Sequence, residues 1–224
     1  MINKRIGALF RRQYSDSNIL FEDLFPFKIN NQDPFDYIIE RTLMRPRDVI
    51  SFVNECISAS EGRSEVSVSH MRQATIEFSR KRLDALEQEW LSSFPTLRKL
   101  LEFFASTHSP IISFSRLLEG DALADLALNI VADGKQQFDP IFDVASIYID
   151  RGQNERFSFL QQIVATAYRT GAIGIKLTSN ERFIYAHVDE PIISPARLNQ
   201  DTRIRIHPML HGAFRLSQDG DGRR

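Results

Sequence analysis

The sequence predicts a mainly helical protein that ends in a small winged-helix-like α+β domain with an antiparallel β-sheet. Three observations lead to this fold class. Apolar residues recur at helical spacing through most of the 224-residue chain. Stretches of alternating apolar and polar residues are confined to the region after residue 171. They follow a series of predicted helices, and helices followed by a hairpin and a further strand are the element order of a winged helix.

The helices of the first half are predicted from their starting signals. Asp33 caps a helix that has Pro34 in its first position, and Pro46 begins the next helix. Ser67 or Ser69 caps a long helix with apolar residues at helical spacing. The predicted helices span about residues 2–12, 34–44, 46–61 and 69–92. Together they form a helical, lid-like subdomain over residues 1–92.

The second half changes from helices to strands. Predicted helices cover about residues 96–106, 116–132, 140–150 and 156–170, and Gly171 ends the last of them. The stretches "IGIKLT" and "RFIYAHV" alternate around Ser179-Asn180 and predict a hairpin. "TRIRIHP" predicts one more short strand. We therefore expect a winged-helix-like domain over residues 93–216 and a disordered tail over residues 217–224.

Composition and charge exclude several classes of protein. Hydrophobic residues make up 42% and charged residues 25% of the chain, as in ordinary globular proteins. The net charge of −1 gives no global attraction to nucleic acid or to an anionic membrane, so such binding would need a local basic patch. Cys56 is the only cysteine, which favours a reducing compartment. With no apolar run of membrane-spanning length and no signal-peptide pattern, the sequence predicts a cytoplasmic protein without a membrane partner.

Motifs for self-sufficient catalysis are missing. The chain has no G-x-x-x-x-G-K-[ST] phosphate loop, no G-x-G-x-x-G, no H-E-x-x-H and no nucleophile elbow. His207 and His211 are four residues apart, but Pro208 lies between them and no cysteine is near, so a surface position is favoured over a metal site. Cys56 lies on an apolar helix and is expected to be a buried, inert thiol. The prediction is a protein with no enzyme activity, metal or cofactor of its own.

The segment Arg45-Pro46-Arg47-Asp48 is unusual at the start of a helix. Arginine there opposes the helix dipole, which favours negative charge at this end. One interpretation is local pairing with Asp48 or Glu40. The other is a phosphate, which suits both the planar guanidinium group and the free N–H groups of a helix start.

The same segment resembles a known group of proteins. "FDYIIERTLMRPRDVISFVNECISAS" contains a T-x-x-R-P-R-D-x-x-x-F-x-N motif. This motif resembles one in bacterial P-loop ATPases related to the AAA+ and STAND groups, where a helical subdomain follows the nucleotide-binding domain. "ATIEFSRKRLDALEQEW", "YRTGAIGIKL" and "DTRIRIHPMLHGAF" are also similar, so the resemblance covers most of the chain.

The resemblance implies a role and a partner. An arginine at the start of a lid helix can act in such ATPases as sensor 2, which approaches the γ-phosphate. Arg47 is the first candidate for this role and Arg45 the second. The Walker A and Walker B motifs of these ATPases are absent from this chain. ATP and Mg²⁺ would therefore be held by a P-loop domain, either upstream in a longer polypeptide or in a partner chain, and this chain would be the sensor and regulatory part.

Two alternatives remain open. A winged helix can bind DNA, and the candidate contacts are Arg156, Arg169, Lys176, Arg182, Arg203 and Arg205. The predicted recognition helix over residues 156–170 carries only two of these arginines, with Gln161 and Gln162 as polar readers. The long helix over residues 69–92 could instead pair with another chain, so the protein could be an interaction module or a homo-oligomer.

Overall fold

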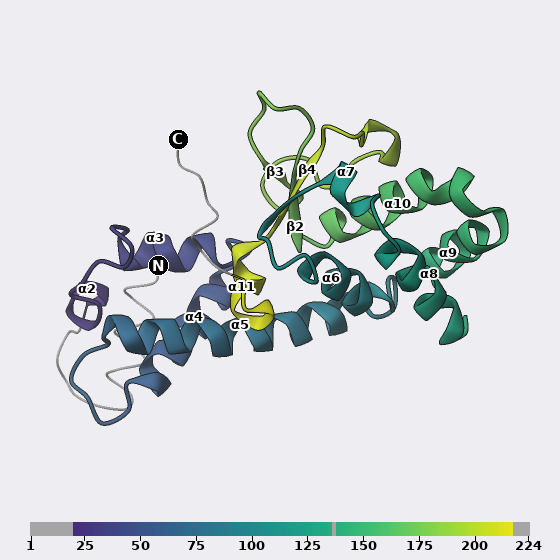
Figure 1. The fold of residues 1–224 in the computed structure, drawn as a ribbon. Helices are drawn as coiled ribbons and strands as arrows, with labels where there is room; N and C mark the ends of the chain where they lie inside the picture. The colour runs from purple at the N-terminus through teal and green to yellow at the C-terminus, as the bar shows by residue number, and fades with distance from the viewer. Residues whose placement is uncertain (1–19, 136–137, 217–224) are drawn as a thin grey trace. The chain divides into compact units, whose positions relative to one another are not determined.

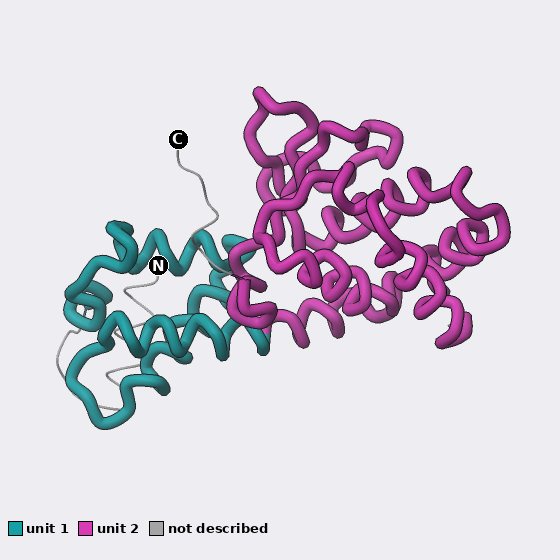
Figure 2. Tube along the Cα trace, in the orientation of Figure 1, with its two compact units in different colours: residues 1–81 teal, residues 82–224 magenta. Residues whose placement is uncertain are grey.

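The computed structural model describes residues 20–135 and 138–216 of the chain. The chain forms two compact units, residues 1–81 and 82–224, which are coloured separately in Figure 2. The division falls inside one long helix, upstream of the boundary that the sequence predicts near residue 92. The predicted helix over residues 2–12 and the predicted disordered tail over residues 217–224 lie outside the described residues.

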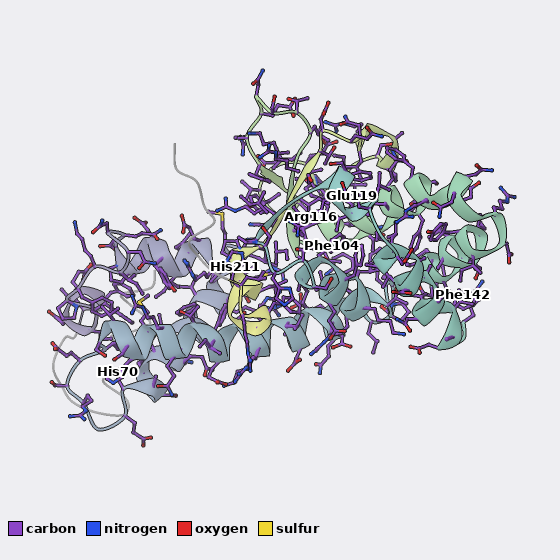
Figure 3. The ribbon with its side chains drawn as sticks, viewed as in Figure 1. His70, Phe104, Arg116, Glu119, Phe142 and His211 are labelled. Carbon is purple, nitrogen blue, oxygen red and sulfur yellow. The ribbon has the colours of Figure 1, made fainter. Side chains whose placement is uncertain are left out.

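The first unit is helical, as the sequence predicts. Its elements are α2 (Phe21–Leu24), α3 (Pro34–Glu40), α4 (Pro46–Ala59) and the first part of α5 (Val68–Trp90) (Figure 1). Oδ1 of Asp33 accepts a hydrogen bond from the N–H of Phe35 at 2.9 Å and so caps α3. Ser67 caps α5, because its hydroxyl accepts from the N–H of His70 at 3.3 Å while Nδ1 of His70 accepts from the N–H of Ser67 at 3.2 Å. His70 is labelled in Figure 3.

Aromatic residues form the core of this unit. The ring of Phe52 on α4 lies 4.7 Å from that of Phe78 on α5 and 6.4 Å from that of Tyr37 on α3, measured between centroids. All three side chains are buried. A second cluster is also buried and belongs to the core: Phe21, Leu24 and Phe25.

Helix α3 is shorter than predicted. It ends at Glu40 and not near Met44, because side-chain and backbone groups compete for its last hydrogen bonds. The hydroxyl of Thr42 donates to the carbonyl of Ile39 at 3.0 Å and lies 3.3 Å from the N–H of Met44. Met44 adopts a φ of 56°, in the left-handed region. This turn brings the chain directly to the start of α4.

The second unit holds the remaining helices and the sheet. After α5 come α6 (Leu97–Ala105), α7 (Phe114–Leu117), α8 (Ala122–Ala132), α9 (Pro140–Arg151) and α10 (Arg156–Arg169), with short 3-10 turns at Gly152–Glu155, Pro195–Arg197 and Pro208–Leu210, and α11 (His211–Phe214) at the end. The helix predicted over residues 116–132 is divided into α7 and α8 around Gly120, whose φ of 64° no helix accommodates. Gly171 follows α10 with a φ of 79°, as predicted for a helix end.

Four short strands form one antiparallel sheet. They are β1 (Ile111–Ser113), β2 (Ile173–Lys176), β3 (Ile184–Tyr185) and β4 (Arg203–Ile206), in the spatial order β1-β4-β2-β3. The three strands predicted from alternation are confirmed, although β3 is only two residues long. Strand β1 is not predicted from the sequence. Strand β4 lies between β1 and β2, so the segment from Leu177 to Thr202, including β3, is one long excursion within the β2–β4 pair.

The observed order of helices, strand, helices, hairpin and strand confirms the predicted fold class, mainly helical with a winged-helix-like α+β part. Phe104 on α6, labelled in Figure 3, is fully buried in this unit. Isoleucines from one face of the sheet also belong to its core. Within residues 20–135 and 138–216, no helix combines the length and the apolar character needed to cross a bilayer.

Candidate functional site

The Arg45–Asp48 segment forms the start of α4. Arg45 occupies the N-cap position and Pro46 the first helical position, where its missing N–H costs nothing. Arginine has no acceptor atom, so the side chain at the N-cap cannot accept from the first N–H groups of the helix. Asp48 is buried in the first turn, and its Oδ1 lies 3.6 Å from Nε of Arg47. The local pairing with Asp48 that the sequence left open is therefore present.

The two arginines differ in exposure. The Arg47 side chain is 64% exposed, while that of its partner Asp48 is only 5% exposed. Arg45 is half-buried. A buried carboxylate thus lies beside an exposed guanidinium group, next to N–H groups at the positive end of a helix dipole. This arrangement is chemically suited to an anion, and Arg47 is the more exposed of the two arginines.

A buried arginine supports the turn before α4. The guanidinium carbon of Arg41 lies 3.4 Å from the centroid of the Tyr37 ring, and Nη1 donates to the Tyr37 carbonyl at 3.0 Å. The hydroxyl of Tyr37 lies 3.2 Å from that of Thr75 on α5. Glu40, the other predicted partner for the arginine pair, lies 3.6 Å from Arg41 instead. These contacts fix the path of the chain into Arg45.

The cysteine and the two C-terminal histidines have structural positions. Cys56 is fully buried on α4, and burial raises the pKa of its thiol, with the charge of Glu55 as a smaller cause. The prediction of a buried, inert thiol is confirmed. The surface position expected for His207 and His211 is wrong, because both rings are buried. Nδ1 of His207 accepts from the N–H of Met209 at 3.1 Å, and Nε2 of His211 lies 2.9 Å from the Ile206 carbonyl.

Three of the predicted nucleic-acid contacts are dispersed and engaged elsewhere. Arg156 donates to the carbonyl of Gly120 and, at 3.2 Å, to Oε1 of Gln153. Arg169 lies at the far end of α10, 5.6 Å from the ring of Phe94. Arg182 pairs with Asp189, and this hydrogen bond, together with one from the N–H of Tyr185, lowers the pKa of the Asp189 carboxyl. On α10 itself, Gln161 donates to the carbonyl of Leu198 at 2.7 Å.

The other three predicted contacts are brought together. Lys176 on β2 stands directly opposite Arg203 on β4, and Arg205 follows Arg203 on the same face of the sheet. The sequence places Lys176 in the predicted hairpin and Arg203 and Arg205 in the predicted strand that follows it, and so does not bring the three together. The cross-strand neighbourhood could not be found from local patterns, since β4 pairs with β2 across an excursion of the chain.

Comparison with known proteins adds one finding. Residues 1–87 match the family model described as a FunZ-associated C-terminal helical domain. The match covers 87 of 224 residues and contains the whole Arg45–Asp48 segment. No curated protein matches the chain. No solved structure matches it either.

The extent of the match agrees with the architecture of the first unit. The similarity to the FunZ-associated helical domain begins at residue 1 and ends inside α5, shortly after the first compact unit does. Helices α2, α3 and α4 all lie within it. The winged-helix-like part lies outside the match.

Proposed function

We propose that this chain is the sensor and regulatory module of a P-loop ATPase. It would couple the nucleotide state of the ATPase domain to domain or partner contacts and carry out no catalysis of its own. The observation that carries this proposal is the exposed Arg47 guanidinium group, which pairs with the buried Asp48 carboxylate at the start of α4. The planar guanidinium group of an exposed arginine suits phosphate oxygens.

The family similarity supports a role beside another domain. Residues 1–87 are similar to a domain described as C-terminal and associated with FunZ. Such a description fits a module that works together with a preceding domain. The resemblance of the Arg-Pro-Arg-Asp segment to the lid region of AAA+ and STAND ATPases supports a P-loop domain in that position, which would hold ATP and Mg²⁺.

The proposed coupling needs only a difference in binding between two nucleotide states. With ATP bound to the P-loop domain, Arg47 and the first N–H groups of α4 contact the terminal phosphate. After hydrolysis and phosphate release this contact is lost, so the module is held less tightly. A module that binds one state better shifts the population toward that state, and its effect is limited by the difference in affinity.

Steady-state ATP turnover by the P-loop domain with this chain present tests the proposal. Arg47→Ala should lower the turnover number about tenfold, equivalent to about 1.4 kcal/mol of lost transition-state stabilisation. Arg47→Lys should restore only part of the activity, because lysine lacks the bidentate fork. The control is Arg72→Ala, which removes an exposed arginine of α5 in the same unit. Unchanged turnover for Arg47→Ala, or an equal loss for Arg72→Ala, would contradict the sensor role.

The P-loop domain for this experiment can be sought in the gene. An open frame that runs upstream of the Met1 codon into a G-x-x-x-x-G-K-[ST] motif after a predicted strand would supply it in the same polypeptide. A neighbouring gene that encodes such a motif would supply it as a partner chain. Turnover should then depend on Arg47 in either arrangement.

A further inference from the structure

The sheet of the second unit has one apolar and one basic face. Residues directly opposite each other on paired strands share a face, and successive residues alternate between faces. One face carries isoleucines that are at most 2% exposed: Ile112, Ile173, Ile175, Ile204 and Ile206. The other face carries Ile111 and Ser113 from β1, Gly174 and Lys176 from β2, Arg203 and Arg205 from β4, and Tyr185 from β3. Phe183, two residues before Tyr185, completes what we call the basic face.

Cations are placed side by side on the basic face. Lys176 and Arg203 stand directly opposite each other in the β2–β4 pair. Like charges in this position destabilise an antiparallel pair. Neither residue forms an ion pair with any part of the chain that the structure describes. The acidic residues that precede β3 and β4 in sequence, Glu181 and Asp201, lie in turns outside the strands.

An external anion would relieve the repulsion between Lys176 and Arg203. Arg203 is exposed and Lys176 is half-exposed, so both charges can be reached from solvent. The spacing of neighbouring strands, about 5 Å, is compatible with two cations contacting a single polyanionic chain. Charge complementarity therefore indicates an occupant with a row of negative charges.

Aromatic rings lie next to these cations. The Tyr185 ring covers Gly174, where an added Cβ would be 2.4 Å from Cε1 of the ring. The Arg205 guanidinium carbon is 5.6 Å from the centroid of the Phe183 ring. Both aromatic residues are half-exposed. Nucleic-acid bases stack on such rings only when they are unpaired, so the combination of cations and rings favours a single strand over a duplex.

The neighbouring helix does not favour duplex recognition. A helix that reads the major groove needs available basic or amide side chains along one face. On α10, Arg156 is bonded to Gly120 and Gln153, and Gln161 is bonded to Leu198. The two cations that lie directly opposite each other, Lys176 and Arg203, are on the sheet and not on this helix.

We propose that the basic face binds single-stranded nucleic acid. Lys176, Arg203 and Arg205 contact phosphates, and Phe183 and Tyr185 stack against bases. This binding goes beyond the nucleotide-sensing role of Arg47, uses a different unit of the chain and stands if that role fails.

Fluorescence anisotropy of a labelled oligothymidylate with the full-length chain tests the proposal. The wild-type protein should bind, and its affinity should fall as salt rises from about 50 to 200 mM. Lys176→Gln combined with Arg203→Gln should weaken binding at least tenfold. It should also flatten the slope of log K against log salt by about 1.4, since each lost phosphate contact of a single strand contributes about 0.7. Because repulsion is relieved, the double variant should melt no lower than the wild type.

A matched control removes two positive charges elsewhere in the same unit. Lys135 and Arg151 are exposed and pair with Asp143 and Glu155. Lys135→Gln combined with Arg151→Gln should leave both the affinity and the salt slope close to wild type. An equal loss in this control would overturn the proposal, because binding would then follow net charge alone.

A second variant separates stacking from charge. Phe183→Leu should weaken oligothymidylate binding several-fold without changing the salt slope, because it removes a stacking surface and no cation. Absence of binding at low salt would overturn the proposal. Tighter binding of a duplex of equal length, unaffected by Phe183→Leu, would also overturn it and would indicate duplex recognition.

Discussion

The ring of Tyr185 occupies the space that a side chain at Gly174 would need. The two residues are cross-strand partners in the β2–β3 pair, and an ideal Cβ on Gly174 would lie 2.4, 2.6 and 2.9 Å from three atoms of the ring. Contacts below 3.0 Å are not sustained, so a larger residue requires the ring to move. Glycine in an otherwise isoleucine-rich strand is thus explained by packing, and an aromatic ring over a strand glycine protects the backbone.

Gly174→Ala should therefore destabilise the protein by about 1–3 kcal/mol, as overpacking does elsewhere. Chemical denaturation followed by circular dichroism measures this change. In a Tyr185→Leu background, the same substitution should cost much less, because the clashing ring is gone. If Gly174→Ala cost the same free energy of unfolding in both backgrounds, the contact between Tyr185 and the added methyl group would not be the cause of the destabilisation.

Arg47 and Asp48 should differ sharply in their effects on stability. Arg47→Ala should change the free energy of unfolding by no more than about 0.5 kcal/mol, because its side chain is 64% exposed and its ion pair is screened by solvent. Asp48→Ala should cost about 1–2 kcal/mol, since it removes a buried acidic group from the first turn of α4.

Denaturation curves of the two single variants measure this difference. Asp48→Asn, which keeps the shape of the side chain and removes its charge, isolates the electrostatic part. A large loss of stability in Arg47→Ala would assign that residue a structural role, and a fall in ATP turnover could then no longer be ascribed to lost phosphate contact.

Asp139 should make stability depend on pH in the acidic range. Its side chain caps α9 by accepting from the N–H groups of Ile141 and Phe142, and burial raises the pKa of its carboxyl above the ordinary value of 3.8. Between the unfolded and the folded pKa, the folded state binds more protons. The contribution of Asp139 to stability is therefore greatest below pH 3.8 and declines as pH rises through the folded pKa.

Asp139→Asn should remove this decline while keeping the cap, because asparagine is an equally good N-cap residue. Asp139→Ala should lose the cap and cost about 0.5–2 kcal/mol at neutral pH. Unfolding free energies measured across the acidic pH range for the wild type and both variants show whether stability declines as pH rises. A wild-type curve that does not differ from the Asp139→Asn curve would contradict the assignment.

The helices were predictable where their starts carried a strong local signal. Pro46 fixed the beginning of α4, and Asp33 and Ser67 supplied the caps of α3 and α5. The ends were harder, because they depend on local competition. The Thr42 hydroxyl donates a hydrogen bond to the carbonyl of Ile39. This side-chain hydrogen bond competes with the helical one, and α3 ends at Glu40, four residues before Met44.

The sheet and the site depended on contacts that no local pattern contains. Strand β1 is only three residues long and is defined by its partner β4. The position of Arg47 at a helix start followed from sequence, but its anchoring by a buried Asp48 required the fold. The hydrogen bonds from Arg156 to the Gly120 carbonyl and from Arg182 to Asp189 likewise could not be predicted from the number of charged residues.

The place of β4 between β1 and β2 has a consequence for synthesis of the chain. Ile111 on β1 pairs with Arg205 on β4, so β1 can pair only after residues far along the chain have been translated. Until β4 has left the ribosome, β1 and the edge of β2 that pairs with β4 expose unpaired backbone groups to other nascent chains. A stalled or prematurely terminated product that lacks residues 203–206 would be open to chaperone capture and aggregation, whereas α2, α3 and α4 of the first unit precede the sheet in sequence and take part in none of its strand pairs.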